Sequence, residues 1–138
     1  APAPVRRRRV LLADDNLDSA ESLAALLRIL GHDVIAAYDG HGAIAAARLH
    51  RPDLILLDIG MPDVNGYDVA RHLRGDPGLD ATTLIALTGY GSEDDRRRSR
   101  AAGFDGHLVK PIDFDELERL LAVFGRGDAT APRRSEAA

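Results

Sequence analysis

Short runs of apolar residues recur along the chain, separated by longer segments of mixed polarity. Three are unbroken and rich in Val, Ile and Leu, at 10–13, 54–57 and 84–87, and two weaker runs lie at 34–37 and 107–109. These runs are too short for helices, and their continuous apolar character is typical of strands that are buried on both faces. We therefore predict five strands of a parallel sheet.

Helical patterns fill the segments between these runs. In the first segment, Ala20, Leu23 and Leu27 recur at helical spacing before Gly31, a residue type that commonly ends helices. The predicted helical segments centre on residues 20–30, 43–49, 69–73, 92–102 and 113–124. Strand and helix thus alternate five times, which predicts an α/β fold with helices on both faces of the sheet.

The ends of the later helices also carry signals. The third is predicted to end near Gly75, and the fourth near Gly103. Ser92, with Asp95 three residues on, resembles a capping box, and Asp113 is placed to cap the last helix. These signals favour helix boundaries at the same places as the apolar periodicity.

The amino-acid composition agrees with this fold and excludes several kinds of protein and of metal site. A chain of 138 residues is enough for one domain, and because only 4% of its residues are aromatic, Leu, Ile, Val and Ala must fill the core. There is no cysteine, which excludes disulfides and thiolate metal sites. No apolar run approaches the roughly 20 residues that a membrane span needs, and no secretory signal is recognisable. We expect a cytoplasmic protein without membrane insertion.

Charge is distributed unevenly. The formal net charge is −4, but residues 10–124 hold 11 basic and 20 acidic residues. An acidic body argues against direct DNA binding, which needs a basic patch. We expect flexible tails at 1–8 and 125–138 around a domain at 9–124, with the Arg run at 6–9 either a solvated linker or a phosphate contact. The chain lacks an initiator Met, so we expect a processed product or a piece of a longer chain.

Polar residues follow the predicted strands directly. The first strand ends in Asp14-Asp15, the third in Asp58, the fourth in Thr88-Gly89 and the fifth in Lys110-Pro111. In an open α/β sheet ligands bind at the carboxyl ends of the strands, so these side chains are expected to converge. Taken singly, the acid pair could be helix caps, and the segment after the third strand an ordinary turn.

Three carboxylates at one edge require a partner charge. Two of them about 4 Å apart repel by roughly 4 kcal/mol at an effective dielectric of 20. Oxygen ligands without Cys or His favour a hard cation, and Mg²⁺ also binds phosphate. A carboxylate can be the nucleophile that forms an aspartyl phosphate. The ammonium of Lys110, the only lysine, would then supply a positive charge for the phosphoryl oxygens, and Gly89 would leave space for the group. No His pair has convincing zinc spacing.

The segment from Asp58 to Tyr67, Asp-Ile-Gly-Met-Pro-Asp-Val-Asn-Gly-Tyr, resembles the phosphoacceptor loop of response-regulator receiver domains. The motifs at the other strand ends fall at that family's spacings, and the resemblance covers about residues 9–124. It implies a flavodoxin-like (βα)5 doubly wound fold with a parallel five-stranded sheet of order 2-1-3-4-5. The segments at 88–91 and 96–105 further resemble receivers of hybrid histidine kinases.

The resemblance also implies roles for individual residues. Asp58 would be phosphorylated and would bind Mg²⁺ together with Asp15 and the main-chain carbonyl of Gly60, while Asp14 would act largely through metal-bound water. At the phosphoryl group, Thr88 would donate a hydrogen bond, Lys110 would pair with the group, and Gly60 and Tyr90 would flank the path of attacking water. The peptide bond before Pro111 would be cis.

One position departs from the family pattern. Three residues before Lys110 the family often has Tyr or Phe, which turns inward on activation, whereas this chain has His107. Three interpretations of His107 stay open. It could rotate on activation as a second switch position besides Thr88, it could add pH sensitivity near neutrality, or it could be a partly exposed strand histidine without a role.

We expect a phosphorelay switch in two-component signal transduction rather than an enzyme, although it would assist its own phosphorylation and dephosphorylation. A histidine kinase or a histidine phosphotransfer protein would donate the phosphoryl group, and residues 91–124 would pass the change to a partner. One alternative is an Asp-nucleophile phosphohydrolase, but the general acid expected two residues after the nucleophile is replaced by Gly60. Another is a flavin or nucleotide carrier, whose phosphate Asp14-Asp15 would repel.

Overall fold

Strands and helices alternate throughout the part of the chain that the computed structural model describes, residues 7–89 and 93–124. In chain order they are β1 (Arg9–Ala13), α1 (Leu17–Ile29), β2 (Asp33–Ala37), α2 (Gly40–His50), β3 (Leu54–Asp58), α3 (Gly66–Arg74), the 3-10 turn η1 (Pro77–Leu79), β4 (Thr83–Thr88), α4 (Glu93–Ala102), β5 (Gly106–Val109) and α5 (Phe114–Phe124). All five predicted strands and all five predicted helices are confirmed. The turn η1 was not predicted.

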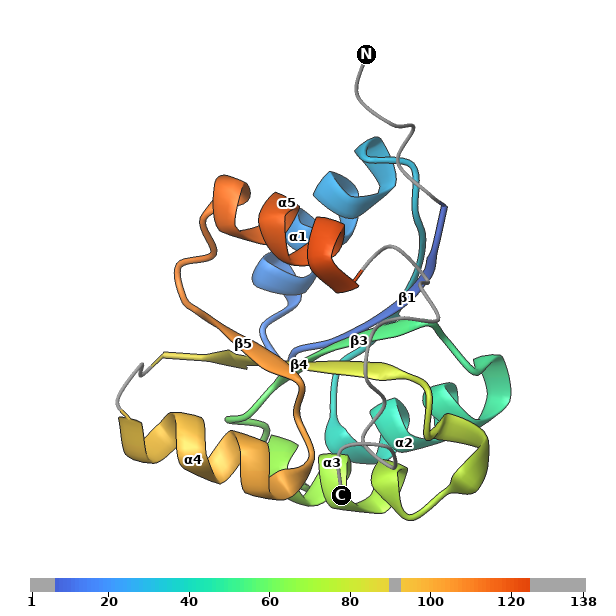
Figure 1. Ribbon diagram of the computed structural model, residues 1–138. Coiled ribbons are helices and arrows are strands. Elements are labelled where there is room, and N and C mark those ends of the chain that lie inside the picture. The colour runs from blue at the N-terminus through green and yellow to red at the C-terminus, as the bar shows by residue number, and fades with distance from the viewer. Residues whose placement is uncertain (1–6, 90–92, 125–138) are drawn as a thin grey trace.

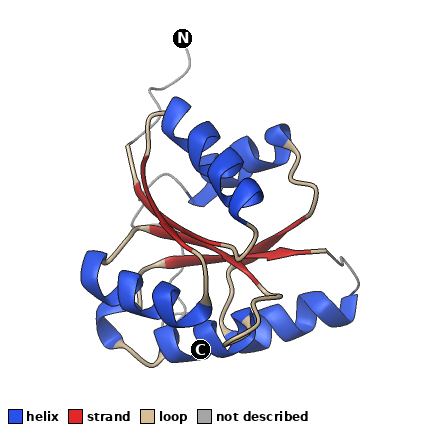
Figure 2. Cartoon of the chain, turned by 180° about the vertical axis from the view of Figure 1, so that it is seen from behind, coloured by secondary structure: helices blue, strands red, loops and turns tan. Residues whose placement is uncertain are grey.

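The five strands form one parallel sheet in the order β2-β1-β3-β4-β5, which confirms the predicted flavodoxin-like topology. Helices α1 and α5 cover one face, and α2, α3 and α4 cover the other (Figure 1). Seen from behind, the same three layers are apparent, with the sheet in the middle (Figure 2). Because all strands run in the same direction, their carboxyl ends share one edge of the sheet.

The central strand β3 explains why the apolar runs are continuous. Its alternate residues Leu54 and Leu56 belong to the core beneath α1 and α5, while Ile55 and Leu57 belong to the core beneath α2, α3 and α4. Successive side chains of a strand point to opposite faces, so a strand covered on both sides must be apolar at every position. The first polar residue of β3 is Asp58, its last, where the strand reaches the edge.

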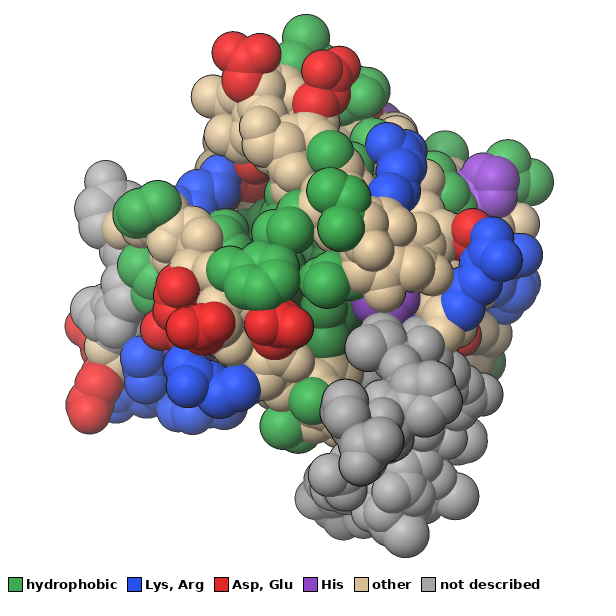
Figure 3. Space-filling model, turned by 90° about the horizontal axis from the view of Figure 1, so that it is seen from above, with side chains coloured by type: hydrophobic (Ala, Val, Ile, Leu, Met, Phe, Trp, Pro, Cys, Tyr) green, Lys and Arg blue, Asp and Glu red, His purple; other side chains and the backbone are tan. Residues whose placement is uncertain are grey.

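On the outer side of the α1 and α5 layer, hydrophobic side chains in the middle are bordered by acidic and basic ones (Figure 3).

None of the helices in the described ranges is both long and apolar enough to cross a lipid bilayer.

Two residues of the predicted N-terminal tail make contacts with the domain. Arg7 forms an exposed ion pair with Asp33 at 2.6 Å, and the backbone N–H of buried Arg8 donates to Nδ1 of His32 at 3.2 Å. Residues 1–6 and 125–138 lie outside the described residues, so the flexible tails stay a prediction. Ser92 of the predicted capping box also lies outside them.

A buried arginine joins segments that are distant in the sequence. The side chain of Arg74, at the end of α3, is 7% exposed and pairs with Asp105 at 2.7 Å. Its other N–H groups donate to the carbonyl oxygens of Gly103 at 2.9 Å and Thr82 at 2.8 Å. The Asp105 carboxylate also accepts the backbone N–H of Leu84 at 2.9 Å. These bonds hold the end of α3, the start of β4 and the connection from α4 to β5 together.

Replacing Arg74 with Ala should lower the free energy of unfolding by about 3 kcal/mol, because it deprives the Asp105 carboxylate of its charged partner and the carbonyl groups of Gly103 and Thr82 of a donor. Arg71→Ala, on the same helix, is the matched control. Its ion pair with Asp68 is more than half exposed, so the loss should stay below about 1 kcal/mol. Urea unfolding of both variants measures the difference. Equal losses in the free energy of unfolding would show that the buried contacts of Arg74 stabilise the fold no more than an exposed ion pair does.

Candidate functional site

The side-chain period of a strand places three of the predicted residues on the same face. Asp14 follows Val10 and Leu12 in alternation, just as Asp58 follows Leu54 and Leu56, and all four apolar residues lie in the core beneath α1 and α5. Lys110 likewise lies two positions after Leu108 of that core. The register pairs Ala13 with Leu57, which sets Asp14 beside Asp58 at the edge of the sheet.

Lys110 bridges the two carboxylates. Its Nζ lies 3.2 Å from Oδ2 of Asp14 and 3.2 Å from Oδ2 of Asp58. The other oxygen of each carboxylate accepts a backbone N–H, from Asn16 at 2.9 Å and from Gly60 at 3.0 Å. Each buried carboxylate is therefore oriented by one main-chain donor and one ammonium.

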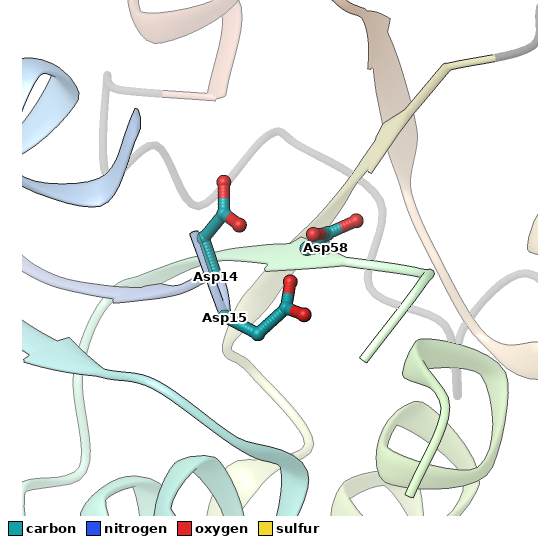
Figure 4. A group of neighbouring side chains, drawn as sticks. All are labelled: Asp14, Asp15 and Asp58. Carbon is teal, nitrogen blue, oxygen red and sulfur yellow. The ribbon is translucent and has the colours of Figure 1, made fainter. Parts of the chain in front are cut away.

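Asp15 completes an acidic cluster. One carboxylate oxygen from each of Asp14, Asp15 and Asp58 lies within 4.8 Å of the others, and Asp15 is the exposed member. Figure 4 shows the carboxylates of Asp15 and Asp58 turned toward the same space, with Asp14 beside them. Opposite ligands of an octahedral Mg²⁺ lie about 4 Å apart, and this ion is bound through one or two carboxylates and water. The oxygen donors of this cluster fit such an ion.

The charges in the cluster alter the proton affinities of its members. Burial raises the pKa of Asp14, and neighbouring Asp58 adds to the rise, against the opposing effects of the Asn16 N–H and Lys110. Burial by itself would lower the pKa of Lys110, but the carboxylates of Asp58 and Asp14 outweigh it, so that pKa is raised. Lys110 therefore remains charged and offsets one of the negative charges around it.

The other predicted site residues occupy the same edge. Thr88 is the buried last residue of β4, and a Cβ added to Gly89 would meet nothing within 4 Å, so there is open space beside it. Gly60 follows Asp58 in the loop between β3 and α3. The Lys110–Pro111 peptide bond is cis, as the resemblance implies. Tyr90 lies outside the described residues.

His107 lies on β5 and is half-buried. Burial lowers its pKa, and the positive charges of Arg96 and Arg100 on α4 lower it further, against the opposing effects of Asp95 and Glu116. The imidazole is thus neutral at pH 7, and its titration is moved away from neutral pH. Any pH response of this side chain belongs to the acidic range.

The alternative that Asp14-Asp15 cap the first helix is wrong. The N-cap of α1 is Asn16, whose side chain accepts the N–H of Ser19 at 3.0 Å, while Asp14 accepts the N–H of Asn16 itself. The cap at Asn16 was not predicted, although Asn directly before a helical pattern is a common N-cap signal. The role of Asp63 was not predicted either, because its partners lie far away in the sequence.

A parallel (βα)5 sheet with clustered carboxylates and one ammonium at the strand ends defines a phosphoacceptor domain of the receiver class. The family model of the response regulator receiver domain matches residues 10–122. The chain therefore belongs to this family, whose general function is to accept a phosphoryl group in two-component signalling.

Individual relatives agree with this assignment. The probable transcriptional regulatory protein TcrX of Mycobacterium tuberculosis is 39% identical over 123 residues, 88% of this chain and 51% of TcrX. This chain thus spans about half the length of TcrX. The chemotaxis protein CheY4 of Vibrio cholerae superposes with a TM-score of 0.82 at 28% identity, covering 86% of this chain and 99% of CheY4.

A third relative bears on the metal. The receiver domain of the sensor histidine kinase PA1611 of Pseudomonas aeruginosa PAO1 was solved with a magnesium ion coordinated in its active-site cleft. It superposes with a TM-score of 0.79 at 33% identity, covering 86% of this chain and 98% of that domain. Binding of Mg²⁺ at an acidic site is thus a property of receiver domains that the cluster described above matches.

Asp14→Asn should raise the free energy of unfolding by about 1 kcal/mol at pH 7 in EDTA, because it removes one of three repelling charges and keeps the oxygen that accepts the Asn16 N–H. A raised pKa means that the cost of ionising Asp14 is absent below its ordinary pKa and grows as the pH rises through the raised value. The gain should therefore vanish toward about pH 4.

Urea unfolding at both pH values measures this effect. Asp80→Asn, away from the cluster, is the control and should change the stability by less than about 0.5 kcal/mol. A clear loss of stability in Asp14→Asn at pH 7 would contradict the account of repulsion.

Proposed function

We propose that Asp58 is the residue that accepts the phosphoryl group, from the phosphohistidine of a histidine kinase or a histidine phosphotransfer protein. The observation that carries this assignment is the position of its carboxylate at the end of β3, within 4.8 Å of Asp14 and Asp15 and 3.2 Å from the ammonium of Lys110. Asp14 shares the acidic cluster and Lys110, but it follows β1, whereas Asp58 ends β3, the strand in the middle of the sheet.

The step is a transfer between two nucleophiles. A carboxylate oxygen of Asp58 attacks the phosphorus, the bond between phosphorus and the donor imidazole nitrogen breaks, and that nitrogen keeps the electron pair and takes up a proton. Such transfers depend mainly on positioning and on neutralising the charge of the phosphoryl oxygens. The Gly60 N–H and Lys110 hold the Asp58 carboxylate in place before the donor arrives.

We infer that Asp15, Asp58 and the main-chain carbonyl of Gly60 hold Mg²⁺, with Asp14 acting largely through metal-bound water. When bound, the ion supplies positive charge to the phosphoryl oxygens and the carboxylates. The exposure of Asp15, next to the two buried acids, supports entry of the ion from solvent on that side.

Phosphorylation then changes what Lys110 and Thr88 bind. Lys110 pairs with Asp14 and Asp58 in the structure, and a phosphoryl group on Asp58 offers it oxygens of higher charge. The hydroxyl of Thr88 is proposed to hydrogen-bond the same group, with Gly89 leaving it room. Both residues lie where β4 and β5 end, so the rearrangement would reach the face of α4, β5 and α5, with His107 as a second switch position.

The donor is proposed to dock where α1 and α5 begin, next to the site. Leu17 and Phe114, the first residues of these helices, are 56% and 40% exposed, and apolar side chains at this position beside the site suit a protein contact. A parent protein of the hybrid kinase type, a cytoplasmic location, and the absence of direct DNA binding and of membrane insertion are part of the same proposal.

We propose a switch rather than an enzyme that turns over small phosphate esters. A phosphohydrolase of the Asp-nucleophile type needs a general acid two residues after the nucleophile, and Gly60 offers only main-chain atoms there. The domain would still assist its own phosphorylation and dephosphorylation.

Acetyl phosphate with Mg²⁺ should add the mass of one phosphoryl group to the wild-type chain and none to Asp58→Asn, because Asn lacks a nucleophilic oxygen. Intact-mass spectrometry measures both, with Asp80→Asn as a control that should be modified like the wild type. Equal modification of Asp58→Asn would transfer the role to another residue.

Asp15→Asn should weaken Mg²⁺ binding at least about tenfold, since a charged ligand becomes neutral. The concentration of Mg²⁺ needed to raise Tm reports this affinity, because a ligand that binds the folded state stabilises it. Asp18→Asn, an exposed residue of α1 outside the cluster, should titrate like the wild type. If Asp15→Asn did so too, Asp15 would not be a ligand.

A further inference from the structure

Asp63 connects the loop after β3 to a helix that precedes it in the sequence. One oxygen of its carboxylate accepts the backbone N–H of Gly40 at 2.8 Å, and the other accepts that of His41 at 3.0 Å. Both donors belong to the first turn of α2. These two bonds lower the pKa of Asp63 to about 2, so the carboxylate is charged across the physiological range.

Helix α2 has a cap of its own. The side chain of Asp39 accepts the N–H of Gly42 at 2.6 Å, and its carbonyl accepts that of Ala43 at 3.0 Å. Asp63 therefore supplements an existing cap from a different segment of the chain. Its distinctive effect is on the loop, which is tied to α2 through charge-assisted bonds.

The same loop is in close contact with backbone at both of its ends. A Cβ on Gly40 would lie 2.6 Å from the carbonyl oxygen of Val64, and a Cβ on Gly66 would lie 2.6 Å from the carbonyl oxygen of Asp58. Both positions thus need glycine for the loop to pack against α2 and for α3 to begin beside the end of β3. Gly60, whose N–H orients the Asp58 carboxylate, lies in the chain between Asp58 and Val64, the two residues whose carbonyl groups make these contacts.

We propose that Asp63 is a positioning residue for the phosphorylation of Asp58: by fastening residues 59–65 to the first turn of α2, it orders the loop before Mg²⁺ and the phosphoryl donor bind. The proposal rests on the proposed function, because it concerns the same site. The Gly60 carbonyl and N–H can act only if the loop backbone is already in place, and a loop that has to be ordered first reacts more slowly and binds the ion less tightly.

The structure offers a matched pair of variants. Asp63→Ala and Asp39→Ala each remove a carboxylate that accepts hydrogen bonds at the N-terminus of α2, so both should lower Tm by a similar amount. Only Asp63→Ala releases the loop. We expect about tenfold slower phosphorylation by acetyl phosphate at saturating Mg²⁺, together with weaker Mg²⁺ binding, in Asp63→Ala. Asp39→Ala should stay within about twofold of the wild type in both measurements.

Asp63→Asn provides a second, milder variant. Its amide keeps one accepting oxygen, so it should bond one of the two N–H groups and show an intermediate rate. Equal rates and Mg²⁺ affinities for Asp63→Ala and Asp39→Ala would overturn the proposal and leave Asp63 as a second helix cap. Failure of the underlying function is distinguishable, because then the wild-type chain itself would not be modified at Asp58.

Discussion

Repulsion between carboxylates at the end of the sheet is the constraint on which this structure depends. Asp14 and Asp58 are 2% and 8% exposed, and Asp15 stands next to them. Their carboxylate oxygens lie within 4.8 Å of one another, and at that distance two carboxylates repel by about 3 kcal/mol even at an effective dielectric of 20. The single ammonium of Lys110 offsets only part of this charge. The domain thus holds a site with excess negative charge, which a bound divalent cation would offset.

The frame around the site keeps these charges from moving apart. Asp14 and Asp58 each give one oxygen to a main-chain N–H, so neither carboxylate turns freely. The strands that carry them lie between two apolar layers, which allow little displacement. Electrostatic repulsion that would otherwise relax by side-chain rotation is therefore retained.

Departure from the family pattern at His107 changes the chemistry of the surface where β5 meets α4. An imidazole is smaller than the Tyr or Phe that the family often has there, and it contributes a group that can titrate. Burial lowers the pKa of this group, and the charges of Arg96 and Arg100 on α4 lower it further. Movement of β5 relative to α4 would alter this electrostatic environment as well as the packing.

The order of strands and helices, the fold class and the residues at the strand ends could all be predicted from the sequence. Buried strands and amphipathic helices have local periodicities, and a parallel sheet brings the ends of all its strands to one edge. The contacts of Arg74 and Asp63 were decided only by the tertiary structure. Arg74 meets Asp105 across 31 residues, and Asp63 meets Gly40 across 23. Hydrogen bonds between residues that are distant in the sequence depend on the folded positions of those residues, and such pairs produce no periodic pattern in the sequence.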